Sequence, residues 1–326
     1  MHIVRSDQLE VSVDAEHGGQ ITKISTGNVE NMLWWSDSHT PVRADRGLSY
    51  GSTAMDWLSG YRGGWQGLIP NAGADSEALG VPLPFHGDTS TSKWTVIESD
   101  DSSILMEVPS RLPLLVRRSV EVQAMGSSFT VRDTIINTAD FPVPFVWGHH
   151  PAWLVDGETS VDMPESVLSV SPDFDTELND LAPGGVMTWP SARTKAGEHV
   201  DVSRVGAVPV ERLGSIGGFT QGWAAVRRES LGVGLGMRWD ASTFPFAWMW
   251  VEIGGQGFPW FGSARIIAIE PMCTSVGDGL AAAFARGEAH TLEGGESRST
   301  ELSVSIFPTV GRPVRGFDEH GNPEFG

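Results

Sequence analysis

Residues 114–139 read LLVRRSVEVQAM and, after Gly126-Ser127, SFTVRDTIINTA. Both segments are rich in β-branched residues and alternate between apolar and polar positions, as a strand with one buried face does. Similar short segments, bounded by Gly, Pro, Asn, Asp or Ser, occur at 9–15, 20–26, 93–99, 103–109, 223–229, 233–239, 246–253, 264–271 and 301–307. Their spacing predicts an all-β fold, a large antiparallel β-sandwich.

Helical segments are scarce. The only fair candidate is short, GDGLAAAFARG at 277–287, and strands do not alternate with long helices, which disfavours Rossmann and α/β-barrel folds. No fixed-period repeat or composition boundary is present, so we expect a single domain over 1–326. We expect the polar stretch 156–215 to form excursions between strands, and the tail after about residue 308 to be loop-like.

Charge and cysteine content restrict the possible partners. The 326 residues include 41 acidic and 22 basic side chains, a formal charge of −19, which repels nucleic acids and anionic membranes. A neutral or cationic small ligand fits better. The first residues lack the apolar core of a signal peptide, no run approaches the roughly 18 apolar residues of a membrane span, and Cys273 is the only cysteine. We therefore expect a cytoplasmic monomer or homodimer.

Two adjacent histidines stand in the apolar segment FVWGHHPAWL, residues 145–154. On a strand His149 and His150 point to opposite faces, so both could bind one metal ion only if the chain turned between them. The other histidines supply neither His-x-His nor His-Glu-x-x-His, and we expect no metal site. Alternatively, one ring is a hydrogen-bonded core residue and the other faces outward, with Pro151 ending the strand.

Two further polar positions are candidates for chemistry. His86 lies in PFHGD, a turn-like context in which the backbone can aim a side chain. Glu270 ends the apolar segment RIIAIEP, on the same strand face as Ile266 and Ala268. A buried carboxylate needs partners, so this residue has either a functional role or a structural ion pair.

Several motifs occur together in a familiar order. They are VSVDAEHGGQITKIS (11–25), NMLWW (31–35), GGWQGLIPNAG (63–73), PLPFHGD (82–88), GHHPAW (148–153), IAIEP (267–271) and LEGGESRSTELSVSIF (292–307). With these motifs the chain resembles the aldose 1-epimerase (galactose mutarotase-like) family over nearly its whole length. The resemblance implies a large antiparallel β-sandwich, in agreement with the strand pattern. It also implies a hexose-like monosaccharide as substrate and a reaction that needs no cofactor.

The resemblance also implies roles for individual residues. Glu270 matches the general base, which takes the proton of the C1 hydroxyl, and His150 matches the general acid, which protonates the ring oxygen. His150 is chosen over His149 because it directly precedes Pro-Ala-Trp. His86 matches a second histidine that contacts the sugar, and tryptophans such as Trp153 would supply a sugar platform. At working pH we expect Glu270 to be ionised and His150 to be protonated.

The chain departs from the family pattern in two places. Ala74 stands where the family usually has an arginine, so Arg62 or Asn71 would supply the polar contact with the substrate. The family's substrate-binding aspartate has no clear counterpart, and Asp240 is the nearest candidate.

Three functions are therefore considered. The first is an aldose 1-epimerase, and the second is a non-catalytic sugar-binding or sugar-sensing protein on the same fold. The third is a glycoside hydrolase or lyase that uses Glu270 with a second acid such as Asp240.

Overall fold

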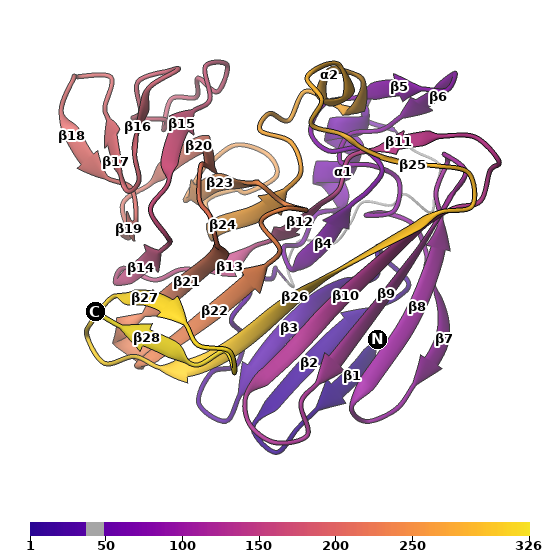
Figure 1. Ribbon diagram of the computed structural model, residues 1–326. Coiled ribbons are helices and arrows are strands. Elements are labelled where there is room, and N and C mark those ends of the chain that lie inside the picture. The colour runs from indigo at the N-terminus through magenta and orange to yellow at the C-terminus, as the bar shows by residue number, and fades with distance from the viewer. Residues whose placement is uncertain (37–48) are drawn as a thin grey trace.

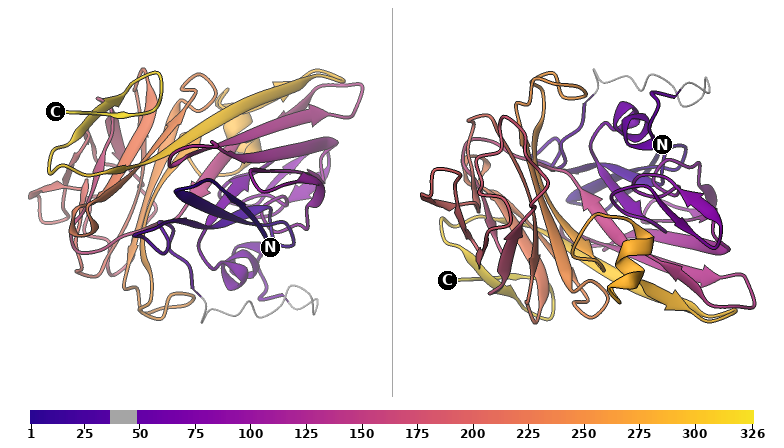
Figure 2. Two further views of the ribbon diagram at one scale, coloured as in Figure 1. Left: turned by 90° about the horizontal axis from the view of Figure 1, so that it is seen from below. Right: turned by 90° about the horizontal axis from the view of Figure 1, so that it is seen from above.

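The computed structural model describes residues 1–36 and 49–326. Two large antiparallel sheets pack face to face around one extended apolar core (Figures 1 and 2). The predicted all-β sandwich is confirmed. Within the described residues, no helix is both long and apolar enough to cross a membrane.

The first sheet carries the cleft described below. In spatial order it contains β1 (His2–Arg5), β2 (Leu9–Asp14), β3 (Gln20–Thr26), β4 (Trp65–Leu68), β12 (Gly148–Pro151), β24 (Arg265–Met272), β23 (Phe246–Ile253), β20 (Val210–Gly217), β15 (Val167–Val170) and β16 (Val186–Thr188), with β13 (Trp153–Leu154) also paired to β24.

The second sheet covers the other side of the core. In spatial order it contains β19 (Arg204–Val205), β14 (Thr159–Asp162), β21 (Gly222–Arg228), β22 (Val233–Trp239), β26 (Ser297–Pro308), β10 (Ser128–Asn137), β9 (Leu114–Val122), β8 (Ser103–Pro109) and β7 (Thr95–Ser99). The alternating segments within residues 114–139 form β9 and β10, which pair from Phe129 with Val122 to Asn137 with Leu114.

Several smaller elements accompany the two large sheets. Four two-stranded sheets pair β5 (Ser76–Ala78) with β6 (Val81–Leu83), β11 (Val143–Phe145) with β25 (His290–Leu292), β17 (Ser191–Arg193) with β18 (His199–Asp201), and β27 (Val314–Phe317) with β28 (Pro323–Phe325). The helices in residues 1–36 and 49–326 are α1 (Thr53–Gly60), α2 (Leu280–Ala285) and the short 3-10 turn η2 (Glu229–Leu231). Both α-helices lie at the upper end of Figure 1.

The expected short helix at 277–287 is confirmed by α2, but three features of the sequence were misjudged. Residues 156–215 contain β14 to β19 and most of β20, which are mostly short strands in polar sequence. The tail after 308 is not only loop, because β27 and β28 pack Phe317 and Phe325 against Phe307. Helix α1 was missed; the Ser52 side chain caps it by accepting a hydrogen bond from the Met55 N–H.

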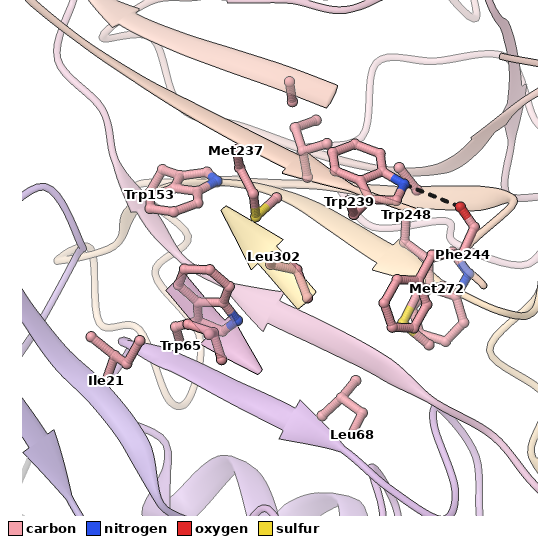
Figure 3. Packing of buried hydrophobic residues seen from close by; sticks show 14 of the residues in the cluster. Ile21, Trp65, Leu68, Trp153, Met237, Trp239, Phe244, Trp248, Met272 and Leu302 are labelled. Atoms are coloured by element: carbon pink, nitrogen blue, oxygen red, sulfur yellow. Dashed lines mark hydrogen bonds between the residues drawn. The ribbon is translucent and has the colours of Figure 1, made fainter. Parts of the chain in front are cut away.

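Large side chains from both sheets meet in the core (Figure 3). Trp65 and Trp153 pack edge to face with ring centroids 5.7 Å apart, and the Trp239 indole N–H donates to the Phe244 carbonyl at 3.1 Å. Indole rings bury a large apolar area while their N–H groups still find acceptors, so they suit this interface.

A buried ion pair also lies between the sheets. Arg118 of β9 donates two hydrogen bonds to Asp133 of β10, at 2.8 and 2.7 Å, and both side chains are almost wholly inaccessible to solvent. Gly67 of β4 makes room for this pair, since a Cβ there would lie 2.3 Å from a guanidinium nitrogen of Arg118. The pair therefore fixes how closely β4 approaches the second sheet.

Candidate active site

A cleft of about 980 Å³ lies on the outer face of the first sheet. Alternate residues of β20 and β23, together with Glu270 of β24, form its floor, while the intervening residues of β23 and β24 enter the core. The loops at 254–262 and 273–279, the turn at 84–88 and α1 border it. The lining residues used below are Trp57, His86, His150, Glu211, Trp248, Trp250, Glu252, Trp260 and Glu270.

His150 and Glu270 face each other across two paired strands. The pairing of Gly148 with Met272 brings His150 of β12 opposite Glu270 of β24, and His150 Nε2 lies 3.7 Å from Glu270 Oε1. Both residues are buried, with 4% and 2% of their surface exposed, and His150 Nδ1 and Glu270 Oε2 have no hydrogen-bond partner. Unpaired buried polar atoms are costly, so this arrangement points to a ligand that completes it.

Burial sets the ionisation of this pair. It lowers the pKa of His150 to about 4 and raises the pKa of Glu270 well above its ordinary value. Burial therefore works against the expected ionised Glu270 and protonated His150, and favours the neutral form of each side chain. The neutral pair and the ion pair contain the same number of protons, so the transfer of one proton between Glu270 and His150 interconverts them.

His86 supplies a hydrogen-bond donor to the same cleft. Its backbone has the left-handed φ of 59°, and Gly87 follows with φ 74° at a position where a Cβ would lie 2.3 Å from the Ile69 carbonyl oxygen. The Gly73 N–H donates to His86 Nδ1 at 3.0 Å, so Nε2 carries the proton. Burial, reinforced by nearby His150, lowers the His86 pKa well below its ordinary value and keeps the ring neutral.

His149 faces the core, as the alternation along a strand requires. Its Nδ1 accepts a hydrogen bond from the Trp65 indole N–H at 3.2 Å, which leaves the proton on Nε2, 3.5 Å from Asp133 Oδ2. Burial lowers the pKa of His149 to about 3 despite the nearby Asp133 carboxylate, so the ring is neutral. Of the two adjacent histidines, His150 therefore lines the cleft and His149 lies in the interior.

Aromatic rings surround the His150–Glu270 pair. Trp57 and Trp250 lie 5.6 and 5.5 Å from the His150 ring, and Trp260 lies 5.5 Å from Trp250. Tyr61 stacks on Trp57 at 4.6 Å, and its hydroxyl has no partner. These rings enclose the pair in apolar surface, which is the physical cause of both pKa shifts.

Two of the expected substrate-binding residues serve the fold instead. The guanidinium of Arg62 lies 4.6 Å over the Trp35 ring, and its Nε donates to the Ser36 carbonyl, outside the cleft lining. Asn71 is fully buried; its amide donates to the carbonyls of Ala74 and Pro84, and its carbonyl accepts the Leu280 N–H at 2.7 Å. Neither replaces the family arginine, and the described lining residues include no lysine or arginine.

Asp240 and Trp153 are also placed away from the cleft. Asp240 is exposed in the turn between β22 and β23, where its carboxylate accepts hydrogen bonds from Ser242 and Thr243. Trp153 is 1% exposed and belongs to the core (Figure 3). The structure therefore does not bring either residue to the cleft, and the prediction that they contact the substrate is wrong for both.

Sequence reasoning missed Glu211 and Glu252, which are paired across β20 and β23 and line the cleft. Burial, together with the neighbouring Glu211 carboxylate, raises the pKa of Glu252 to about 8. The alternation in FAWMWVEI was the available signal, because it places Glu252 on the same face as Trp248 and Trp250. Among residues 1–36 and 49–326, no group of three His, Cys, Asp or Glu side chains is arranged to hold a metal ion.

The sandwich and the placement of the cleft define a galactose mutarotase-like fold, and comparisons with known structures agree. A Synechocystis protein is 16% identical over 95% of this chain and 96% of its own, with a TM-score of 0.68. A galactose mutarotase related enzyme from Lactobacillus acidophilus is 14% identical over 95% and 98%, with a TM-score of 0.62. An aldose epimerase homologue from C. elegans is 14% identical over 95% and 99%, also with a TM-score of 0.62.

The match to a sequence-family model shows which family this chain belongs to. The chain belongs to the family described as "Domain of unknown function (DUF4432)", whose model matches residues 1–306. Comparison with curated proteins finds no match. The suspected resemblance to aldose 1-epimerases is thus confirmed at the level of the fold.

Proposed function

We propose that this protein is an aldose 1-epimerase, which interconverts the α and β anomers of a free, hexose-like aldose. The observation that carries the proposal is the His150–Glu270 pair, buried at the cleft floor with an unpartnered atom on each side chain. Such a pair can accept one proton and donate another, which is what hemiacetal opening requires.

The reaction begins when a C1 hydroxyl hydrogen-bonds to Glu270 and stabilises its carboxylate form, which moves the shared proton to His150. Glu270 then takes the C1 hydroxyl proton, and the electron pair of that O–H bond forms the aldehyde. The bond between C1 and the ring oxygen breaks, and the ring oxygen receives the His150 proton. This leaves Glu270 protonated and His150 neutral, the ionisation state that burial favours.

Rotation about C1–C2 and ring closure in the reverse sense complete the exchange of anomers. In this scheme His86 donates its Nε2 proton to a sugar oxygen, and Trp57 contacts an apolar face of the ring.

Polarimetry on freshly dissolved α-glucose and α-galactose tests the proposal. We expect wild type to accelerate mutarotation, and Glu270→Gln to lower kcat/KM by about 10²–10⁴-fold, the usual contribution of a positioned base. Asp240→Asn is the matched control, because Asp240 lies outside the cleft and its loss should leave the rate unchanged. Equal rates for wild type and Glu270→Gln would contradict the assignment.

A second candidate function is a non-catalytic sugar-binding protein. It is favoured by the absence of lysine and arginine from the described cleft lining, where the family usually has an arginine. This alternative predicts calorimetric binding of a monosaccharide without acceleration of anomer exchange. The glycoside hydrolase or lyase that pairs Glu270 with Asp240 loses its second acid, because Asp240 is not in the cleft.

A further inference from the structure

The cleft is longer than one sugar ring. Glu270 is paired with Trp248, and Glu252 lies four residues further along β23, about 13 Å at roughly 3.3 Å per residue. Side chains stand nearly perpendicular to a sheet, so the two carboxyl groups keep much of this separation. A pyranose has five bonds between O1 and O4, which at about 1.5 Å each reach no more than about 7.5 Å. A single ring at Glu270 therefore leaves the Glu252 end of the cleft empty.

The volume agrees with this length. About 980 Å³ is near the top of the range of roughly 300–1,000 Å³ for pockets that hold drug-sized ligands, which are larger than a monosaccharide. Between the two ends lie Trp250, which is on the same face of β23 as Glu252, and Trp260, 5.5 Å from Trp250. Both indoles are half-buried and line the cleft, so they offer a second apolar platform beyond the first ring.

The carboxyl groups of Glu211 and Glu252 form the polar end of this platform. They are cross-strand partners, and the Gly255 N–H donates to Glu252 Oε1 at 3.0 Å. Both Oε1 atoms converge on Gly255, where a Cβ would lie 2.5 Å from that of Glu252 and 2.8 Å from that of Glu211. The two carboxyl groups therefore lie side by side, and their oxygens can accept hydrogen bonds from hydroxyl groups.

We propose that the cleft binds a neutral reducing disaccharide or longer oligosaccharide, with its reducing unit at His150 and Glu270. The second unit lies on Trp250 and Trp260, and its hydroxyl groups donate to Glu211 and Glu252. This inference rests on the proposed function for the placement of the reducing unit. It also assigns charge selectivity: three carboxyl groups without a described lysine or arginine in the lining disfavour a uronate or phosphate on the second unit.

Isothermal titration calorimetry with cellobiose, maltose and lactose, compared with glucose and galactose, tests the second-unit site. We expect at least one disaccharide to bind about tenfold or more tightly than either monosaccharide. Glu252→Gln should weaken that disaccharide by about tenfold or more, as the loss of a hydrogen bond to a charged pair does, and change monosaccharide binding less than about twofold. Glu121→Gln, on the exposed face of β9, is the matched control and should change neither.

If Glu252→Gln does not fold, Glu211→Gln replaces it, because Glu211 is more exposed. The proposal is overturned if no disaccharide binds more tightly than the monosaccharides, if the substitution weakens both classes equally, or if no sugar binds. An aldobiuronic acid that binds as tightly as its neutral counterpart would overturn the charge selectivity.

Polarimetry on the same sugars separates the two proposals. Disaccharide binding that depends on Glu252, without faster mutarotation of any sugar, would support the second-unit site and refute the epimerase. Accelerated mutarotation of monosaccharides, without tighter disaccharide binding, would refute the second-unit site and support the epimerase.

Discussion

The buried Arg118–Asp133 pair gives a sharp test of how the interior supports the cleft. Asp133→Asn preserves the shape of the side chain but removes the negative charge that faces the guanidinium. Burial alone would raise the pKa of Asp133, yet Arg118 holds that pKa below its ordinary value, so the native carboxyl is ionised. The substitution therefore leaves an arginine cation in the core without its counter-ion.

The magnitude follows from burial. Arg118 is 1% exposed and Asp133 0%, so water cannot replace the two lost charge-assisted hydrogen bonds. Removing one partner of such a pair costs about 3–5 kcal/mol of unfolding free energy. The exposed pair of Arg132 and Glu301, with side chains 60% and 41% accessible, is the matched control. Glu301→Gln should cost no more than about 1 kcal/mol.

Urea unfolding monitored by tryptophan fluorescence measures both changes. The double variant Arg118→Met/Asp133→Leu removes both charges and should recover most of the stability, because apolar replacements of buried pairs are often neutral or stabilising. An Asp133→Asn variant within about 1 kcal/mol of wild type would refute the reasoning. So would a double variant no more stable than the single one.

Three further predictions concern the cleft and its support. The kcat/KM for mutarotation should fall below about pH 4, because His150 then holds a proton while Glu270 is also protonated, and no base remains; a profile that is flat to pH 3 would contradict this. Because the pKa of Glu252 is raised to about 8, its protonated form stabilises the fold. This stabilisation is fully present below about pH 4.5 and is lost progressively as the pH rises to about 8. Glu252→Gln should therefore gain about 1–3 kcal/mol relative to wild type between pH 5 and pH 9 in urea unfolding, and a pH-independent difference would count against it. Gly67→Ala should destabilise by about 1–3 kcal/mol, since its Cβ would overlap the Arg118 guanidinium, whereas Gly206→Ala, with open space around it and, like Gly67, no positive φ, is the control and should change stability little.

Much of the sandwich could be predicted because its central strands alternate in polarity. Leu114–Val122 and Ser128–Asn137 show the period of two clearly, since one face meets the core and the other meets water. Strands β14 to β19 were missed because they are only two to four residues long, too short for that period to emerge from polar sequence. Helix α1 was missed because its sequence, TAMDWLSG, lacks the alanine run that indicated the shorter α2.

The candidate site was predictable only where the strand itself fixes a side chain's direction. Glu270 and the two faces of the histidine doublet follow from alternation, and the structure places them accordingly. Arg62 and Asn71 are in irregular segments, where backbone turns decide what a side chain meets, and sequence spacing carries no such information. The closeness of Glu211 to Glu252 depends on how β20 pairs with β23 across 40 intervening residues, which no local pattern encodes.

Strand β12 constrains how this protein can change over evolution. His149 supports the interior and His150 serves the cleft, so inserting or deleting one residue within this four-residue strand would exchange the two environments. Such a change would damage stability and chemistry in a single step, with no viable intermediate. Changes of length should therefore accumulate in the loops that border the cleft, where they would alter the choice of ligand while leaving the reacting groups in place.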